Sequence, residues 1–283
     1  MAAGLTRCHL FTQVISMTKN NENRKRPSLL RLALVAVLTV SLLVSGGILL
    51  RSHLAQRKYK ALAESVRQQT AETTAVAPSD NPADTAEPTQ PPRQLLPQYA
   101  ELYEQNPDFF GWLKIADTMV DYPVMHAPGT TEKYLYRDFY GNNYFGGTPY
   151  VDERCTPDST NLLIYGHNIT DGSMFRGILR YEDPEFWQAH PTIRFDTWWE
   201  TGEYEIVAAF YDRIYFSNEK VFKFYNVIEL PDEESYNDAI ANFKAKALYD
   251  TGVTPEFGTR LITLVTCTYH TDNGRFVVVA AKK

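Results

Sequence analysis

Cysteine is scarce in this chain of 283 residues, which contains three: Cys8, Cys155 and Cys267. Small secreted domains that depend on disulfides are dense in cysteine, so the chain does not belong to that class. Cys8 precedes a long apolar run, and only Cys155 and Cys267, which both follow it, could pair. Neither is explained by a disulfide framework, so each needs its own interpretation.

Positive charge is scarce after residue 60. The first 60 residues contain ten Lys and Arg and one acid, a net charge of +9. The remaining residues contain 18 Lys and Arg and 33 Asp and Glu, a net charge of −15. Nucleic-acid-binding domains carry clustered basic residues. We therefore expect no nucleic-acid partner for the main part of the chain.

Long uncharged runs are absent except at residues 32–50, which are mostly Leu, Val and Ala. One bilayer crossing requires about 20 apolar residues, whereas a cleaved signal peptide has roughly 7–15. No small-residue cleavage site follows, so we expect an uncleaved transmembrane signal-anchor at 32–50. Basic residues flank it on both sides and barely decide its orientation. Since the tail is short, we expect residues 1–31 in the cytoplasm and the larger part outside the cell; Met17 is an alternative first residue.

Residues 51–96 are predicted to connect this anchor to a folded body. The stretch from 51 to about 69 is polar and helix-prone, and it is expected to continue the membrane helix. Residues 70–97 are rich in Pro, Thr, Ala and Asp and have too little apolar surface to fold, which is typical of a linker. The folded body is expected to occupy residues 97–283.

The body shows many short strands and few helices. Predicted strands cover 110–115, 119–124, 148–152, 161–165, 204–210, 260–266 and 275–281. Helices are predicted at 98–105, 173–180 and 232–249, with a further helical turn at 131–136. This pattern predicts a mainly β fold, a barrel or sandwich of seven or eight strands with helical insertions.

The last two strands are expected to form a hairpin, because Asn273-Gly274 lies between two apolar runs. One run ends at Cys267 and the other begins with Arg275. Antiparallel pairing would place the thiol and the guanidinium at one edge of the sheet. A lone cysteine in a strand is more often buried than reactive, so the hairpin alone leaves both interpretations open.

A cysteine nucleophile needs a base or an electrostatic partner. The body offers four histidines: His126, His167, His190 and His270. His167 follows the buried strand 161–165 at the Gly166 break, a position typical of site residues at a sheet rim. His270 lies in the hairpin loop, where a solvated residue is equally expected. Taken singly, each of these histidines is more often structural than catalytic.

Four motifs in order resemble those of the sortases. They are Tyr-Gly-His-Asn at 165–168, Gly-Ser-Met-Phe at 172–175, Thr-Leu-Val-Thr-Cys at 263–267 and Arg-Phe-Val-Val at 275–278. The sortase signature is Thr-Leu-x-Thr-Cys with a later Arg and an upstream His, and the Gly-His-Asn run looks like class B. The resemblance implies a closed β-barrel of seven to eight strands with an N-terminal helix and a long helix between late strands. Residues 97–283 would be the catalytic domain.

The resemblance also implies a chemistry for these residues, that of a cysteine transpeptidase of Gram-positive bacteria. Cys267 matches the nucleophile, which forms an acyl-thioester, and His167 matches the general acid/base. Arg275 matches the group that stabilises the oxyanion or orients the substrate. Thr266 and Asn168 are expected to contact substrate; for Asn168, orienting the histidine and capping the turn are both open.

The implied partners are secreted proteins with a C-terminal sorting signal and an amine of peptidoglycan, or alternatively a pilin lysine. The enzyme would lie in the cell membrane as a single-pass protein with its catalytic domain outside. The acids of the body are dispersed and match no calcium-binding loop, so we expect no metal, and no cofactor is implied.

Two other classes stay open on sequence grounds. A papain-like hydrolase places Cys before His, whereas His167 comes first here, and an L,D-transpeptidase would need Arg where Tyr269 stands. The other class is a non-catalytic anchored β-domain in which Cys267 is merely buried.

Overall fold

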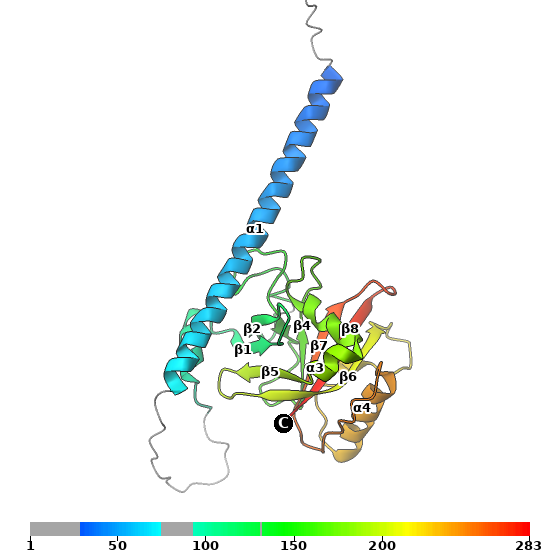
Figure 1. Ribbon diagram of the computed structural model, residues 1–283. Coiled ribbons are helices and arrows are strands. Elements are labelled where there is room, and N and C mark those ends of the chain that lie inside the picture. The colour runs from blue at the N-terminus through cyan, green and yellow to red at the C-terminus, as the bar shows by residue number, and fades with distance from the viewer. Residues whose placement is uncertain (1–28, 75–92, 131) are drawn as a thin grey trace, which may run out of the picture. The chain divides into compact units, whose positions relative to one another are not determined.

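The computed structural model describes residues 29–74, 93–130 and 132–283 (Figure 1). The chain divides into two compact units, Met1–Gly47 and Ile48–Lys283. The second unit contains every strand of the described ranges.

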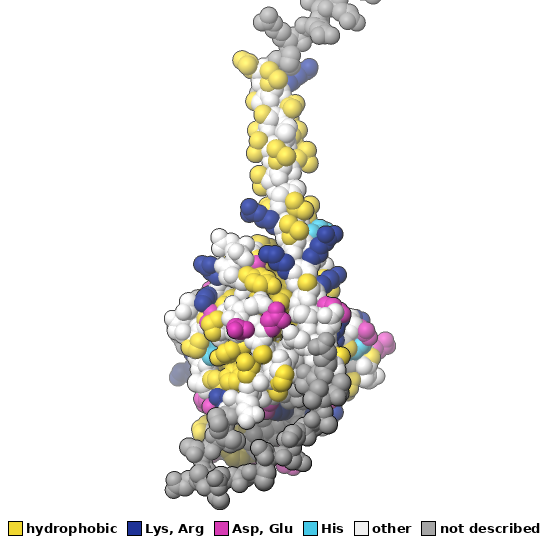
Figure 2. All heavy atoms as spheres, turned by 90° about the vertical axis from the view of Figure 1, so that its left-hand side faces the viewer, with side chains coloured by type: hydrophobic (Ala, Val, Ile, Leu, Met, Phe, Trp, Pro, Cys, Tyr) yellow, Lys and Arg dark blue, Asp and Glu magenta, His cyan; other side chains and the backbone are white. Residues whose placement is uncertain are grey.

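Helix α1 (Leu29–Thr74) is the helix among the described residues that is long and apolar enough to cross a membrane. Its most apolar window has a mean hydropathy of 2.5, and none of that window is buried. Figure 2 shows hydrophobic side chains along this part of α1, followed by Lys and Arg. These features fit a membrane anchor, and the helix continues past residue 51 as predicted. Much of the predicted linker falls on residues 75–92, which lie outside the described ranges.

Eight strands form a closed barrel in the order β1-β2-β3-β4-β7-β8-β6-β5. The strands are β1 (Phe109–Lys114), β2 (Asp121–Met125), β3 (Tyr150–Val151), β4 (Asn161–Tyr165), β5 (Thr192–Thr197), β6 (Glu203–Arg213), β7 (Leu261–Cys267) and β8 (Gly274–Lys282). Two pairs, β2–β3 and β4–β7, are parallel, and the others are antiparallel. The closed barrel predicted from the sequence is confirmed. Strand β4 is mostly buried and its residues are mostly apolar, as expected for a strand in a parallel pair.

Of the remaining helices, two precede β1 and the others lie between later strands. They are η1 (Pro97–Tyr99), α2 (Ala100–Gln105), η2 (Phe175–Glu182), α3 (Pro184–Ala189), η3 (Phe224–Asn226) and α4 (Glu233–Lys246). Helix α4, the predicted long helix, begins where the Asp232 carboxylate caps the Ser235 amide at 2.8 Å. It buries Tyr236, Ile240 and Phe243 in a cluster shared with β6 and β8.

Two sequence predictions differ from the structure. The predicted helical turn at 131–136 is not helical at 133–136, where the chain forms turns; Glu132 has a positive φ of 56°, which a helix does not allow. Strand β5 and helix α3 were not predicted. Strand β5 does show buried Ile193 and Phe195 on either side of exposed Arg194, a short alternation that the Trp-rich turn after it obscures.

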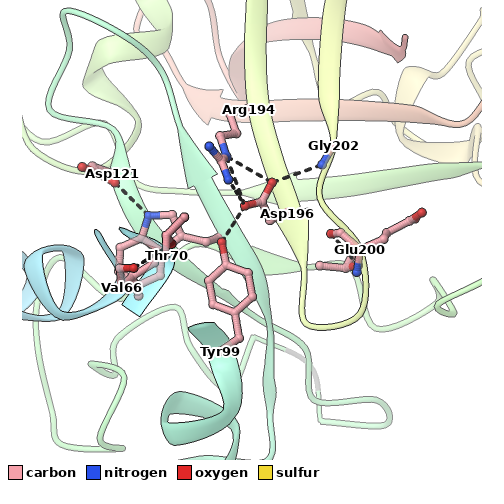
Figure 3. Close-up of polar contacts among 10 residues, drawn as sticks. Val66, Thr70, Tyr99, Asp121, Arg194, Asp196, Glu200 and Gly202 are labelled. Atoms are coloured by element: carbon pink, nitrogen blue, oxygen red, sulfur yellow. Dashed lines mark hydrogen bonds and ion pairs between the residues drawn. The ribbon is translucent and has the colours of Figure 1, made fainter. Parts of the chain in front are cut away.

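The C-terminal half of α1 packs on the barrel. Its buried side chains belong to the same apolar cluster as β1 and β2: Tyr59, Leu62, Ala63 and Val66. A polar network supports the same side of the barrel (Figure 3). The buried Asp196 carboxylate accepts hydrogen bonds from the Tyr99 hydroxyl at 2.7 Å and from the Arg194 guanidinium at 2.9 Å. The stretch 59–66 of α1 therefore packs on the folded body.

Candidate active site

The parallel pair β4–β7 brings two distant segments to one edge of the barrel. Tyr165 pairs with Val265, and the Gly166 amide donates to the Val265 carbonyl at 3.1 Å. His167 and Cys267 each lie two residues further on. Because side chains alternate along a strand with a period of two, this offset directs both to the same face.

The hairpin supplies the third residue. Strands β7 and β8 pair antiparallel, with Cys267 directly opposite Arg275. Side chains of directly opposed residues lie on the same face, so both side chains are on one face of the hairpin. The Arg275 Nη1 donates to the carbonyls of Asn273 and Gly274 at 3.1 and 2.9 Å, which orients the guanidinium across the turn. The hairpin predicted at Asn273-Gly274 is confirmed.

His167, Cys267 and Arg275 line one cavity of about 490 Å³. Its walls also include Leu135 and Tyr136 from the connection between β2 and β3, and Tyr150 of β3. Side chains from four strands and from the connection between β2 and β3 therefore line the cavity at one end of the barrel. Such a concave site with a few convergent polar groups is the usual form of an enzyme site.

The two cysteines of the body differ sharply. Cys267 is exposed, whereas Cys155 is buried with its Sγ 3.7 Å from the Asn161 carbonyl. Burial raises the pKa of the Cys155 thiol to about 12. Only Cys267 is therefore placed to act as a nucleophile, and the interpretation of Cys267 as a buried core residue does not hold.

The His167 ring is held by the chain that connects β2 to β3. Its Nε2 lies 2.9 Å from the Leu135 carbonyl. A carbonyl only accepts, so Nε2 carries a proton and Nδ1 is the acceptor nitrogen of the neutral ring. Phe145 lies parallel to the ring at 6.3 Å between centroids, and Tyr136 lies at 5.3 Å. Burial lowers the pKa of His167, although the Leu135 carbonyl and the charge of Glu132 oppose this effect.

The two predicted substrate-binding residues make contacts within the protein. Thr266 is buried, and its hydroxyl donates to the Gly166 carbonyl at 2.7 Å. The Asn168 Nδ2 donates to the Cys267 carbonyl at 2.9 Å, and its Oδ1 accepts from Arg176 at 3.2 Å. Both side chains thus join the segment that bears His167 to the strand that bears Cys267. Their contact with substrate stays a prediction.

Sequence reasoning missed the groups that hold His167. The Leu135 carbonyl is a backbone atom and leaves no trace in the sequence. Tyr136 ends the predicted helical turn at 131–136, and Phe145 follows it in a stretch without a predicted element; that both are exposed aromatic residues was the available signal. His270, by contrast, is tied to the Thr268 hydroxyl at 2.6 Å and to the Tyr211 ring, outside the lining of the cavity.

Asp152 and Arg154 form an ion pair in the cavity wall. The Arg154 guanidinium contacts both oxygens of Asp152 at 2.8 Å, and the Tyr165 hydroxyl donates to the same carboxylate. Burial alone would raise the pKa of Asp152, but these hydrogen bonds lower it. These two charges of the wall are therefore paired with each other. No group of three His, Cys, Asp or Glu side chains is arranged to hold a metal ion in the described parts of the chain.

Comparison with known proteins agrees with this arrangement. The model of the sortase domain family matches residues 113–283. Sortase B of Listeria monocytogenes is 31% identical over 190 residues, which span 65% of this chain and 74% of that protein. Sortase B of Staphylococcus aureus is 29% identical over 192 residues, which span 66% of this chain and 75% of that protein. A solved Staphylococcus aureus sortase B–substrate complex has a TM-score of 0.68 over 83% of this chain and 98% of its own, at 21% identity, and it supports the fold.

Proposed function

Because this chain belongs to the sortase family, class B, and is thus a cysteine transpeptidase of sorting signals, we propose that Cys267, His167 and Arg275 carry its reaction. In this proposal the enzyme cleaves the C-terminal sorting signal of a secreted protein and joins the protein to an amine of the cell wall. The observation that supports it is the pairing of β4 with β7 and of β7 with β8, together with one cavity that all three residues line.

In the first half-reaction, Cys267 attacks the scissile carbonyl of the sorting signal. His167 takes the thiol proton on Nδ1, since its Nε2 is engaged with the Leu135 carbonyl. The Arg275 guanidinium stabilises the oxyanion of the tetrahedral intermediate with a fixed set of donors. The intermediate collapses as the C–N bond breaks, and the His167 imidazolium gives its proton to the leaving amine. A thioester on Cys267 remains.

In the second half-reaction, an amine attacks the thioester. His167 takes a proton from the amine nitrogen, and Arg275 again stabilises the oxyanion. The C–S bond breaks, the Cys267 thiolate leaves the acyl carbon and takes the proton from His167, and a new amide joins the secreted protein to the acceptor. The lowered pKa of His167 suits this cycle, because a neutral ring accepts protons and its imidazolium gives them up readily.

The acceptor is proposed to be an amine of peptidoglycan or its precursor, and a pilin lysine is the alternative. The site contains no feature that selects one of them. The proposed setting is the outer face of the cell membrane, with residues 1–31 in the cytoplasm, 32–50 as the anchor, 51–96 as a juxtamembrane helix that packs on the barrel and a Pro-rich linker, and 97–283 as the catalytic domain.

A transfer assay on the full-length protein in detergent micelles tests the proposal. A library of quenched peptides would be offered with and without added amines, and the products would be identified by mass. We expect cleavage and amide formation for the wild type, no turnover for Cys267→Ala, and losses of about 10²-fold or more for His167→Ala and Arg275→Ala. Near-normal transfer by Arg275→Ala would refute its oxyanion role. Arg260→Ala, which breaks an ion pair with Glu200 away from the cavity, is the matched control.

A further inference from the structure

The residues that hold His167 belong to one connecting segment, 132–148, which we call the 132–148 loop. It supplies the Leu135 carbonyl and the rings of Tyr136 and Phe145. Gly147 crosses directly over that carbonyl: its φ is +59°, and a Cβ on this residue would lie 2.3 Å from the Leu135 oxygen. The position of the carbonyl that binds His167 therefore depends on where Gly147 and its neighbour Thr148 are held.

Helix α1 holds this end of the loop. The Tyr59 hydroxyl lies 2.7 Å from the Thr148 Oγ1 and 3.3 Å from the Gly147 carbonyl. The Thr148 hydroxyl gives its single proton to the Arg137 carbonyl at 2.8 Å, so Tyr59 is the donor in the first pair. The Tyr59 ring is 3% exposed and also contacts the Tyr144 ring at 6.2 Å. One buried side chain of α1 thus reaches three points of the loop.

A second contact reaches the other side of His167. The Gln56 Nε2 donates to the Asp171 carboxylate at 2.9 Å. Asp171 in turn accepts from the Ser173 amide and hydroxyl at 2.9 and 2.6 Å. This short turn is bound back to the histidine, because the Phe175 amide donates to the His167 carbonyl at 2.8 Å. Side chains one helical turn apart on α1 therefore support both chain segments next to His167.

We propose that Tyr59, assisted by Gln56, is a positioning residue of the active site, which fixes the His167 ring through Thr148, Gly147 and the Leu135 carbonyl. This inference rests on the role proposed for His167 above. It gives the segment of α1 after the membrane anchor a part in catalysis in addition to anchoring. The effect is pre-organisation: the Leu135 carbonyl selects the ring form in which Nδ1 faces the reaction, and the helix holds the carbonyl in place.

The test compares two tyrosine-to-phenylalanine variants in the full-length protein in detergent micelles. Tyr59→Phe removes the hydroxyl that holds the loop. Tyr99→Phe removes an equally buried hydroxyl, whose bond goes to Asp196 of β5, and neither residue lines the cavity. We expect Tyr59→Phe to lower kcat by about tenfold with little change in KM. The ¹⁵N shifts of His167 should also move away from the Nε2-protonated form, whereas Tyr99→Phe should change neither quantity.

A double-mutant cycle with Thr148→Val makes the test independent of general destabilisation. Thr148→Val removes the same contact from the loop side, so its effect on kcat and that of Tyr59→Phe should not add in the double variant. Unchanged kcat and unchanged His167 ¹⁵N shifts in Tyr59→Phe would overturn the proposal, as would full additivity. The ¹⁵N readout needs no turnover, so it reports on positioning even if His167→Ala were to show that the catalytic role is wrong.

Discussion

At the scale of single residues, the site depends on the contrast between exposed and buried members of the same residue type. Cys267 is open to the cavity, whereas Cys155 lies in the core. His167 lines the cavity with one nitrogen occupied and one available, whereas His190 is bound to the Asp117 carboxylate at 2.9 Å. Residue type alone would not separate the members of each pair; position at the strand end does.

The thiols should differ in reactivity. A membrane-impermeant methanethiosulfonate reagent added to the folded protein is expected to modify Cys267 and leave Cys155 unmodified, because burial keeps Cys155 protonated and inaccessible. Peptide mapping by mass spectrometry measures each site separately. Cys155 should become reactive only in denaturant, which serves as the control. An inert Cys267 in the folded protein would contradict its role as nucleophile.

His167 should titrate below the ordinary histidine value of 6.5, because burial disfavours its charged form. The folded protein therefore holds this ring neutral at pH 7, and protonation should set in only as the pH falls below 6.5. NMR titration of ¹⁵N-labelled histidine, assigned with a His167→Gln variant, measures the midpoint. A midpoint above 6.5 would show that Glu132 and the Leu135 carbonyl outweigh burial.

At the scale of elements, the parallel pairing of β4 with β7 is the feature that builds the site. The pairing ends in two side-chain bonds, one from Thr266 to the Gly166 carbonyl and one from Asn168 to the Cys267 carbonyl. These bonds fix the two strand ends against each other just where the backbone ladder stops. In the Thr-Cys dipeptide, the first residue is therefore structural, and the second is the proposed nucleophile.

Removing the Thr266 hydroxyl should weaken this junction. Thr266→Val is expected to cost about 1 kcal/mol of unfolding free energy, the net value of a typical buried hydrogen bond, and to lower the transfer rate through displacement of Cys267. Thr266→Ser keeps the hydroxyl and is the matched control. Denaturant unfolding and the transfer assay measure the two effects. Wild-type stability and transfer in Thr266→Val would show that the junction depends on the shape of the side chain rather than on its hydroxyl.

The elements that the sequence predicted are those with strong local signals. The hairpin follows from Asn273-Gly274, and helix α4 from its apolar spacing and its Asp232 cap. That His167 and Cys267 share one site was implied by the motif resemblance alone. Local sequence patterns could not predict it, because the pairing of β4 with β7 joins segments a hundred residues apart. The Leu135 carbonyl could not be predicted, since its position depends on the packing of Gly147 and Tyr59 against the loop.

At the scale of the whole molecule, residues 48–283 form one compact unit. The sequence suggested a polar extension of the membrane helix followed by a linker, with the folded body starting near residue 97. Side chains such as Leu62 and Val66 instead lie in the barrel's apolar cluster. Their helical spacing was visible in the sequence, but basic residues on either side, such as Lys60 and Arg67, masked the apolar face.

Orientation in the membrane can be tested on cells. In a background with all three cysteines replaced, single cysteines would be introduced as Lys19→Cys in the tail and Lys283→Cys at the end of the body. An impermeant maleimide should label Lys283→Cys on intact bacteria and Lys19→Cys only after the membrane is permeabilised. The reverse pattern would place the catalytic domain in the cytoplasm and contradict the proposed function.

The most direct measurement is the capture of the acyl-enzyme. The full-length protein would be mixed with a cleavable sorting-signal peptide from the library in the absence of an added amine, quenched in acid and mapped by mass spectrometry. We expect a thioester adduct on the proteolytic peptide that contains Cys267, and no adduct in Cys267→Ala. The adduct should disappear when an amine is added. Peptide cleavage that persists in Cys267→Ala, or an adduct on another residue, would contradict the role proposed for Cys267.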